Sequence, residues 1–381
     1  MKKIIYCLIL FFVGISVSFA EILNSPTWGY SVDLPEEFVL VDKNGADSYM
    51  FENAFVSSTV ILKAYKKEKF SSSLEAMETV MKQLGAEFEC AETDWRNTDC
   101  IISQFAFNLG GASNTGWAVS SLLQDSKGYV IMLCYTPTEV FYDLEQFVIS
   151  CVDSLCIDYG SYYSPGPLTS FAFPKGEVQN HTVEIAGEKI DFPLNSNDIE
   201  ADRFVVEREY SVLSLYQESE MWVEAWQRYY RQVYKNAYSR LKIAAFNIYN
   251  RLIKTCESEN PDIELAQKLL SWTQGFDYVR DFTSTDFTPI TASITGTGSD
   301  CDSRAMLLAC LLHHMNYDTC LFVSAEFSHS LFGIVLDKAG AKINIDGRQF
   351  LLGETTAQVD IGLVPANMNQ TDKWIFVELN N

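Results

Sequence analysis

The sequence is poor in histidine, and it lacks the common signatures of metal and nucleotide sites. Only 4 of its 381 residues are histidine. It contains neither His-Glu-x-x-His nor a paired Cys-x-x-Cys, and the adjacent His313 and His314 cannot both face one metal ion from a helix. The turn Gly296-Thr-Gly298 lacks the Lys-Ser/Thr ending of a phosphate-binding loop. No metal site is therefore expected, and no metal or organic cofactor is implied.

Positive charge is also scarce. The chain has 28 Lys and Arg against 50 Asp and Glu, which gives a net charge of −22 and a pI near 4.5. Such a surface repels nucleic acid and anionic lipid, so neither is an expected partner. The exception is 227–254, where seven Lys or Arg occur without an acidic residue. These cations either face acidic parts of the same chain, which is the simpler interpretation, or dock an anionic ligand such as a cell-wall polymer.

Long hydrophobic runs are missing except at the N-terminus. Residues 1–20 combine a basic start, an apolar centre and the small-x-small ending Ser18-Phe-Ala20, which is the pattern of a secretory signal peptide. As an uncleaved anchor, its run of about 16 apolar residues would be short for a membrane span. We therefore expect an exported protein, periplasmic or secreted, that begins near Glu21 and meets the membrane only if the signal peptide stays attached.

The cysteines predict at least one free thiol. There are ten, and Cys7 would leave with the signal peptide, so an odd number remains in the exported chain. The pairs Cys90 with Cys100 and Cys151 with Cys156 are close enough in sequence to form local bridges, which the sequence leaves undecided.

The length predicts more than one domain, since about 360 residues after signal cleavage exceed what one hydrophobic core usually holds. Residues 21–157 alternate like an antiparallel sheet and contain two predicted helices, Leu74–Leu84 and Glu139–Val152. Residues 158–198 are rich in Gly, Pro, Ser and Tyr and are predicted to be a linker, with room for a small hairpin at Val183–Asp191.

Residues 199–381 are predicted to hold a helical region and a C-terminal domain with its core at 263–356. Apolar residues spaced by three and four predict one long amphipathic helix from Trp222 to Leu252. Further on, Tyr317–Val323, Leu331–Asp337 and Lys342–Leu352 are typical of strands. The predicted fold class is therefore α+β.

Cys301 lies at the point where a glycine-containing turn enters a helix, in Gly296-Thr-Gly-Ser-Asp-Cys-Asp-Ser-Arg-Ala305. Apolar residues recur after it at helical spacing, so one face of the predicted helix is core. Unpaired N–H groups and the positive end of the helix dipole favour a thiolate there. His329 follows on a predicted strand, and carboxylates come next at Asp346 and Glu354. A cysteine, a base and an orienting acid are the parts of an acyl-transfer site.

The core at 263–356 resembles the transglutaminase-like superfamily, whose papain-like site uses a cysteine, a histidine and an acid. The resemblance rests on the Asp-Cys-Asp-Ser-x-Ala helix start and the single His-bearing strand, and it implies Cys301 as nucleophile and His329 as base. The family strand Gly-x-x-Trp-x-x-x-Asp-x-Thr matches 347–356 with Phe350 for Trp and Glu354 for Asp. Glu354 is therefore the preferred third member, and Asp346, eight positions too early, is the alternative.

The N-terminal pattern at 21–157 resembles the PsbP-like α/β sandwich, without a motif behind the resemblance, and implies a binding or targeting module. Together the two resemblances imply an exported multidomain protein that carries out thiol-dependent acyl transfer or amide hydrolysis on a peptide or protein. The alternative is a non-catalytic binding or scaffold protein of the cell envelope that keeps a degenerate transglutaminase-like fold.

Overall fold

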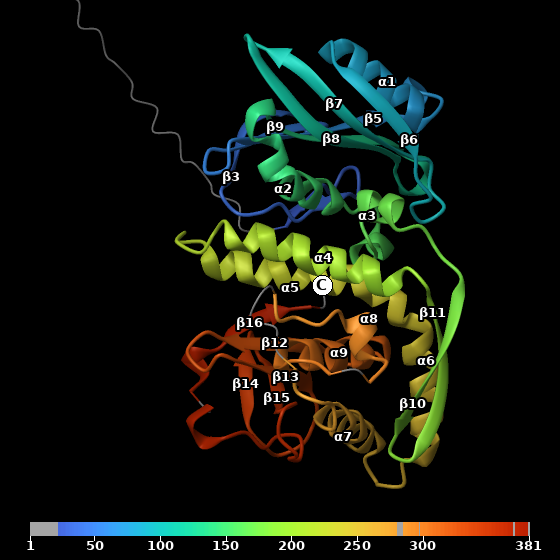
Figure 1. The fold of residues 1–381 in the computed structure, drawn as a ribbon, viewed down its shortest axis with the longest axis vertical. Helices are drawn as coiled ribbons and strands as arrows, with labels where there is room; N and C mark the ends of the chain where they lie inside the picture. The colour runs from blue at the N-terminus through green and yellow to red at the C-terminus, as the bar shows by residue number, and fades with distance from the viewer. Residues whose placement is uncertain (1–21, 280–284, 297, 369, 380–381) are drawn as a thin grey trace, which may run out of the picture.

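The computed structural model describes residues 22–279, 285–296, 298–368 and 370–379. The expected signal peptide, 1–20, lies outside the described residues. Figure 1 shows three parts stacked along the long axis: an N-terminal sheet with its helices, a middle layer of two helices, and a C-terminal sheet with its helices. The fold is α+β, as the sequence predicts.

The N-terminal part is a seven-stranded antiparallel sheet in the order β3-β4-β5-β9-β8-β7-β6. Its strands are β3 (Phe38–Asn44), β4 (Ser48–Asn53), β5 (Ser58–Lys66), β6 (Glu87–Glu92), β7 (Cys100–Leu109), β8 (Ala112–Leu122) and β9 (Gly128–Pro137). Two helices accompany it, α1 (Ser73–Leu84) and α2 (Phe141–Asp153), and a two-stranded pair of β1 (Leu23–Asn24) with β2 (Ser31–Val32) lies beside them.

The two helices cover opposite faces of this sheet, because successive side chains of a strand point to opposite sides. On β9, Val130 and Met132 belong to the core that includes α2, whereas Tyr129 and Ile131 belong to the core that includes α1. We call this seven-stranded sheet with α1 and α2 the sandwich.

Residues 158–198, the predicted linker, contain regular structure. A 3-10 helix, Tyr159–Tyr163, precedes α3 (Pro167–Ala172), and a hairpin follows from β10 (Val178–Ile185) and β11 (Glu188–Asn195). Val183, Ile185, Ile190 and Phe192 of the hairpin are buried in the C-terminal core. The hairpin is therefore packed onto the C-terminal part through its inward-facing residues.

The predicted single helix from Trp222 to Leu252 is wrong, because the structure divides it. The middle layer consists of α4 (Asp198–Ser214) and α5 (Trp222–Tyr238), and α6 (Lys242–Leu252) follows after one 3-10 turn. Figure 1 shows α6 running in a different direction from α5. No proline or glycine marks the break, so packing causes it: α5 lies against α4, and α6 lies against β11 and the C-terminal helices.

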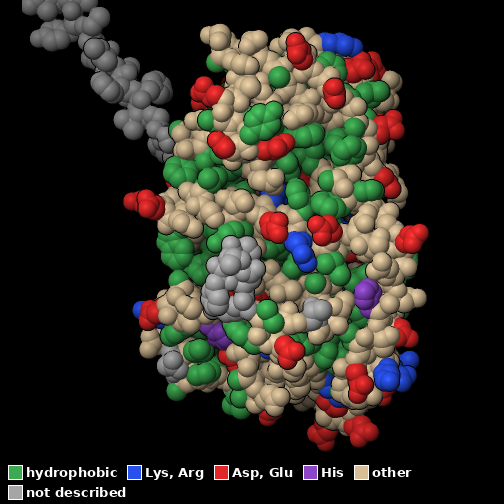
Figure 2. Space-filling model, viewed as in Figure 1, with side chains coloured by type: hydrophobic (Ala, Val, Ile, Leu, Met, Phe, Trp, Pro, Cys, Tyr) green, Lys and Arg blue, Asp and Glu red, His purple; other side chains and the backbone are tan. Residues whose placement is uncertain are grey.

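The basic stretch 227–254 is directed largely into the protein. Five of its cations bond to carboxylates or carbonyls of the same chain, and most of these bonds join α5 to the sandwich or to α4. They are Arg228 to Glu209 (2.9 Å), Arg231 to Asp33 (2.9 Å), Lys235 to the carbonyl of Asp153 (2.9 Å), Arg240 to Asp198 (2.6 Å) and Arg251 to Glu188 (2.5 Å). On the face in Figure 2, red acidic side chains outnumber blue basic ones. This agrees with basic side chains that bond to groups within the protein.

The C-terminal part is a five-stranded antiparallel sheet in the order β14-β15-β13-β12-β16. Its strands are β12 (Thr319–Ser324), β13 (His329–Val335), β14 (Lys342–Ile345), β15 (Arg348–Gly353) and β16 (Ile375–Glu378), and its helices are α7 (Pro261–Gln274), α8 (Ile290–Ser293) and α9 (Cys301–His314). The predicted strand Lys342–Leu352 is in fact a hairpin, because Asp346 and Gly347 adopt positive φ (50° and 86°) and turn the chain. In the described part of the chain, no helix combines the length and the hydropathy of a membrane span.

Candidate active site

Cys301 is the first residue of α9, as the sequence predicts. The side chain of Asp300 caps the helix by accepting a hydrogen bond from the backbone N–H of Ser303 at 2.9 Å, which satisfies one of the free donors of the first turn. Behind this end, α9 packs against β12 and β13. The Cys301 side chain is 5% exposed and lines a cavity of about 340 Å³.

His329 begins β13 and lines the same cavity. Its Nε2 atom lies 2.8 Å from Oε2 of Glu354, which directly follows β15. The register explains the contact, because β13 pairs with β15 and brings Gly353 opposite Phe332. Chain positions 301, 329 and 354 thus belong to one helix start and two adjacent strands.

Glu354 is held as a carboxylate. Its Oε1 atom accepts hydrogen bonds from the backbone N–H and the hydroxyl of Thr356, both at 2.7 Å. Burial alone would raise the pKa of Glu354, but His329 and the Thr356 donors outweigh it and lower that pKa below its usual range. Because a carboxylate only accepts hydrogen bonds, Nε2 of His329 is the donor. In the neutral imidazole Nδ1 then carries the lone pair.

Asp346, the alternative third member, lies elsewhere. It sits in the exposed turn between β14 and β15, eight residues before Glu354, or about 26 Å along an extended strand. The structure therefore brings Glu354 to His329 and leaves Asp346 at the far end of β15.

The sequence-based expectation of a thiolate at Cys301 is not met in this structure. The thiol donates a hydrogen bond to Oδ1 of Asp302 at 3.1 Å. Burial raises the pKa of Cys301, and the charges of Asp302 and Asp300 raise it further, while a backbone hydrogen bond from Ser330 acts in the opposite direction. Burial and the carboxylates that flank the sulfur therefore outweigh the helix dipole, and the sulfur is held as a thiol.

Asp302 is a residue to which sequence reasoning assigned no role. Besides the thiol, it accepts hydrogen bonds from the hydroxyls of Tyr230, on α5, and Ser330, on β13. Burial and the charge of Asp302 raise the pKa of Tyr230, so this phenol stays protonated as a donor. One available signal was the spacing of Trp222, Trp226 and Tyr230 by four, which predicts one aromatic stripe on a helix. These three residues lie on the apolar face of the amphipathic helix that the sequence predicts.

Aromatic side chains form part of the lining of this cavity. Tyr210 comes from α4, Trp226, Tyr229 and Tyr230 come from α5, and Phe287 precedes α8. The ring centroids of Trp226 and Tyr230 are 6.2 Å apart, and those of Tyr229 and Phe287 are 6.2 Å apart at a right angle. The middle layer therefore supplies one side of the cavity, and the C-terminal part supplies the cysteine and the histidine.

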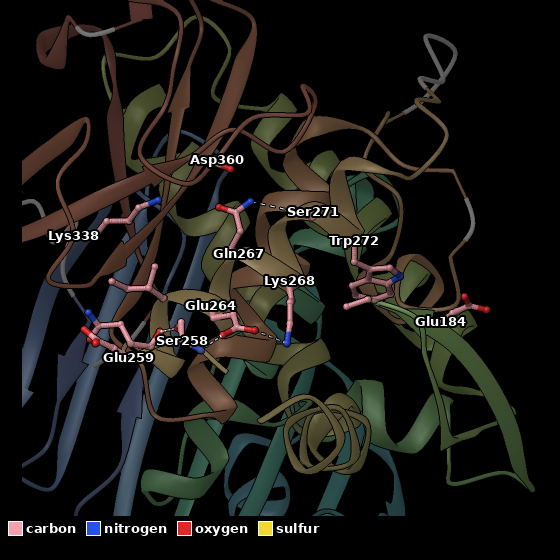
Figure 3. A pocket seen from close by; sticks show the side chains of 13 residues that line it. Glu184, Ser258, Glu259, Glu264, Gln267, Lys268, Ser271, Trp272, Lys338 and Asp360 are labelled. Atoms are coloured by element: carbon pink, nitrogen blue, oxygen red, sulfur yellow. Dashed lines mark hydrogen bonds and ion pairs between the residues drawn. The ribbon is translucent and has the colours of Figure 1, made fainter. Parts of the chain in front are cut away.

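A larger hollow, of about 890 Å³, lies along α7 (Figure 3). Several of its polar groups bond to one another: Lys268 pairs with Glu264 at 2.8 Å, and Gln267 donates to Ser271 at 3.1 Å. Of the described residues that line it, none is a cysteine or a histidine. We therefore place the candidate site at Cys301.

The remaining cysteines and histidines take structural positions. The nine described cysteines, Cys90, Cys100, Cys151 and Cys156 among them, are free thiols. His313 bonds to the hydroxyl of Tyr234, and Nε2 of His314 lies 2.8 Å from the carbonyl of Tyr238. Within the described ranges, no cluster of His, Cys, Asp or Glu has a metal-binding arrangement.

No protein-family model and no curated protein matches the chain. Among solved structures, its N-terminal part resembles cyanobacterial PsbP (CyanoP) from Synechocystis sp. PCC 6803, with 12% identity over 38% of this chain and 95% of that chain and a TM-score of 0.29. It also resembles the Ran-binding protein Mog1p from Saccharomyces cerevisiae, with 10% identity over 37% and 96% of the two chains and a TM-score of 0.28. A candidate protease from Parabacteroides distasonis matches 84% of this chain and 69% of its own at 8% identity and a TM-score of 0.21. Likenesses at these levels carry no inference about activity.

Proposed function

We propose that this chain is an exported, thiol-dependent acyltransferase or amide hydrolase that acts on a peptide or protein, with Cys301 as nucleophile, His329 as base and Glu354 as the residue that orients the imidazole. The observation that carries the proposal is that His329, which Glu354 contacts at 2.8 Å, lines the same cavity as Cys301 at its helix start. The resemblance of residues 263–356 to the transglutaminase-like superfamily supports it.

The proposed chemistry needs no group beyond the chain and the substrate. Nδ1 of His329 takes the thiol proton, and the sulfur of Cys301 attacks the carboxamide carbon. Backbone N–H groups around Cys301 stabilise the oxyanion. The C–N bond then breaks, the imidazolium returns its proton to the departing amine, and water or a second amine resolves the thioester. Glu354 stays ionised and fixes the tautomer throughout.

A chromogenic ester tests the acylation step without knowledge of the natural substrate. With p-nitrophenyl acetate, we expect one burst of p-nitrophenolate per chain, an acetyl group on Cys301 by peptide mass mapping, and loss of both in Cys301→Ala. His329→Ala should slow the burst by about a hundredfold or more. Cys310→Ala, which removes a buried thiol on the same helix, is the matched control and should keep the burst.

A second candidate function is binding without turnover, with the C-terminal part as a scaffold. The hydrogen bond from the Cys301 thiol to Asp302 and the raised pKa of that thiol favour it, since a protonated sulfur is a poor nucleophile. Iodoacetamide labelling across a pH series separates the two functions. An enzyme should lose most of its Cys301 labelling rate in His329→Ala, whereas a scaffold should label at the same slow rate with or without the histidine.

A further inference from the structure

We infer that the cavity at Cys301 selects an acyl donor that carries a cationic side chain, of the arginine or lysine type, beside the reacting carboxamide. This inference rests on the proposed function and adds the substrate class. It follows from the composition of the cavity walls, which combine aromatic rings with carboxyl groups and contain no lysine or arginine among the lining residues that the structure describes.

A row of aromatic rings on α5 runs from the exposed Trp222 to Trp226 and Tyr230, which line the cavity. Trp222 is 38% exposed at the start of α5, and its ring centroid lies 5.8 Å from that of Trp226, which in turn lies 6.2 Å from that of Tyr230. Tyr230 is 1% exposed and bonds to Asp302 beside Cys301. Rings arranged in this way attract a guanidinium or ammonium group through their electron-rich faces.

Carboxyl groups join the aromatic rings in the cavity lining. Asp286, Asp300 and Asp302 all line the cavity. Burial, followed by the charge of Asp302 and a smaller effect of Asp286, raises the pKa of Asp300 well above its usual range, so Asp300 favours its neutral form and Asp302 supplies the negative charge beside the sulfur. A low-dielectric cleft lined by one sign of charge concentrates ligands of the opposite sign.

A cation bound here would also affect the nucleophile. Asp302 now accepts the thiol hydrogen bond and, after burial, is the largest cause of the raised pKa of Cys301. A positive group beside Asp302 offsets that charge and makes loss of the thiol proton to His329 easier. The correct substrate would thus help to activate the sulfur that attacks it. A volume of about 340 Å³ is at the lower end of the range for ligand pockets and suits one side chain and its flanking backbone.

Two methanethiosulfonates of opposite charge test the cavity without requiring turnover. The sulfur of Cys301 attacks the sulfenyl sulfur of the reagent, an S–S bond forms, methanesulfinate leaves, and the thiol proton passes to His329 or solvent. The measured quantity is the rate with the trimethylammonioethyl reagent divided by the rate with the sulfonatoethyl reagent. Cys90, a partly buried thiol on the sandwich, supplies the reference ratio in the same sample.

We expect the ratio at Cys301 to exceed that at Cys90 by at least about tenfold at low salt. Asp302→Asn and Trp226→Leu should each bring it to within about threefold of the reference, because each removes one of the attractive elements. Glu259→Gln, a carboxylate of the hollow along α7, is the matched control and should leave the ratio unchanged. If Asp302→Asn fails to fold, Trp226→Leu decides the test. Equal ratios at Cys301 and Cys90 would overturn the inference.

A matched pair of ligands gives a second measurement. Nα-acetyl-arginine amide should protect Cys301 from iodoacetamide at a concentration at least about tenfold lower than Nα-acetyl-citrulline amide, which has nearly the same shape without the charge. Equal protection by the two would count against the inference. A p-nitrophenyl acetate burst without charge preference would refute only the cationic donor, and charge preference without a burst would refute only the catalytic function.

Discussion

Replacing Glu354 by glutamine should show how much the orientation of the His329 ring contributes to catalysis, because the ring itself stays in place. The substitution keeps the volume of a side chain that is 3% exposed, and an amide oxygen can still accept the two hydrogen bonds from Thr356 at 2.7 Å. The amide nitrogen then faces Nε2 of His329, where Oε2 now lies at 2.8 Å. Two N–H donors cannot bond to each other, so the ring must move its proton to Nδ1 to keep the contact.

That tautomer leaves Nδ1 without a lone pair for the thiol proton. We therefore expect the rate of Cys301 acylation by p-nitrophenyl acetate to fall by about 10⁴-fold, which corresponds to about 5 kcal/mol of transition-state stabilisation. The loss of folding free energy should be much smaller, about 1–2 kcal/mol, because one charge-assisted hydrogen bond is exchanged for a neutral one. Burst kinetics and urea unfolding of the same preparation measure the two quantities.

Asp346→Asn is the matched control, since it neutralises the other candidate acid in an exposed turn, and it should change neither quantity. Acylation by Glu354→Gln within about threefold of the unsubstituted protein would refute the orienting role of Glu354. The pKa of Glu354 is lowered, so its contribution to stability is present above the ordinary value near 4.5 and is lost as the pH falls through the lower folded-state value. The free energies of unfolding of Glu354→Gln and Asp346→Asn should therefore differ most at neutral pH.

Three further predictions concern buried charge. Arg228→Met should lower the free energy of unfolding by about 3 kcal/mol in urea titrations, because it removes the 2.9 Å partner of the buried Glu209; a loss below about 1 kcal/mol would contradict this. Burial raises the pKa of Glu36 to about 7, so folding takes up a proton between pH 4.5 and 7, and Glu36→Gln should stabilise the protein by up to about 3 kcal/mol at pH 8 and little at pH 5. Burial lowers the pKa of His313 and His314 to about 4, so unfolding takes up protons. The free energy of unfolding should therefore drop by about 2 kcal/mol in total as the pH falls from 6.5 to 4, after allowance for partial exposure. If a variant with Gln at both positions keeps the full dependence of stability on pH, these residues are not the cause.

Elements with strong local signals were predictable from the sequence. The helix at Leu74–Leu84 starts beside a serine, and in the structure Ser72 accepts from the N–H of Glu75 while Gly85 ends the helix at positive φ. Cys301 likewise starts its helix as predicted. The pairing of His329 with Glu354 followed from the spacing of a family motif, and the structure places these two side chains in contact. Their catalytic role stays a prediction.

Features set by distant packing were not predictable. The break between α5 and α6 has no local marker, because it depends on what each half packs against. The Asp346-Gly347 turn did have a local signal, since Asp-Gly is a typical dipeptide of hairpin turns. The β-branched and apolar residues on both sides of it led to the prediction of one continuous strand. The pKa of Cys301 depends first on burial and then on Asp302 and Asp300, which flank it in the sequence. The two carboxylates could be read from the local sequence, but the burial that raises the pKa most is set by tertiary packing.

The helix pair α4–α5 touches both halves of the molecule. Val212, Tyr216 and Ala225 are buried in the core of the sandwich, and Trp226 and Tyr229, one turn further along, line the cavity at Cys301. A truncated chain that begins at α4 would present those three apolar residues, with the buried arginines beside them, to water. Expression of the C-terminal part alone should therefore yield aggregated protein.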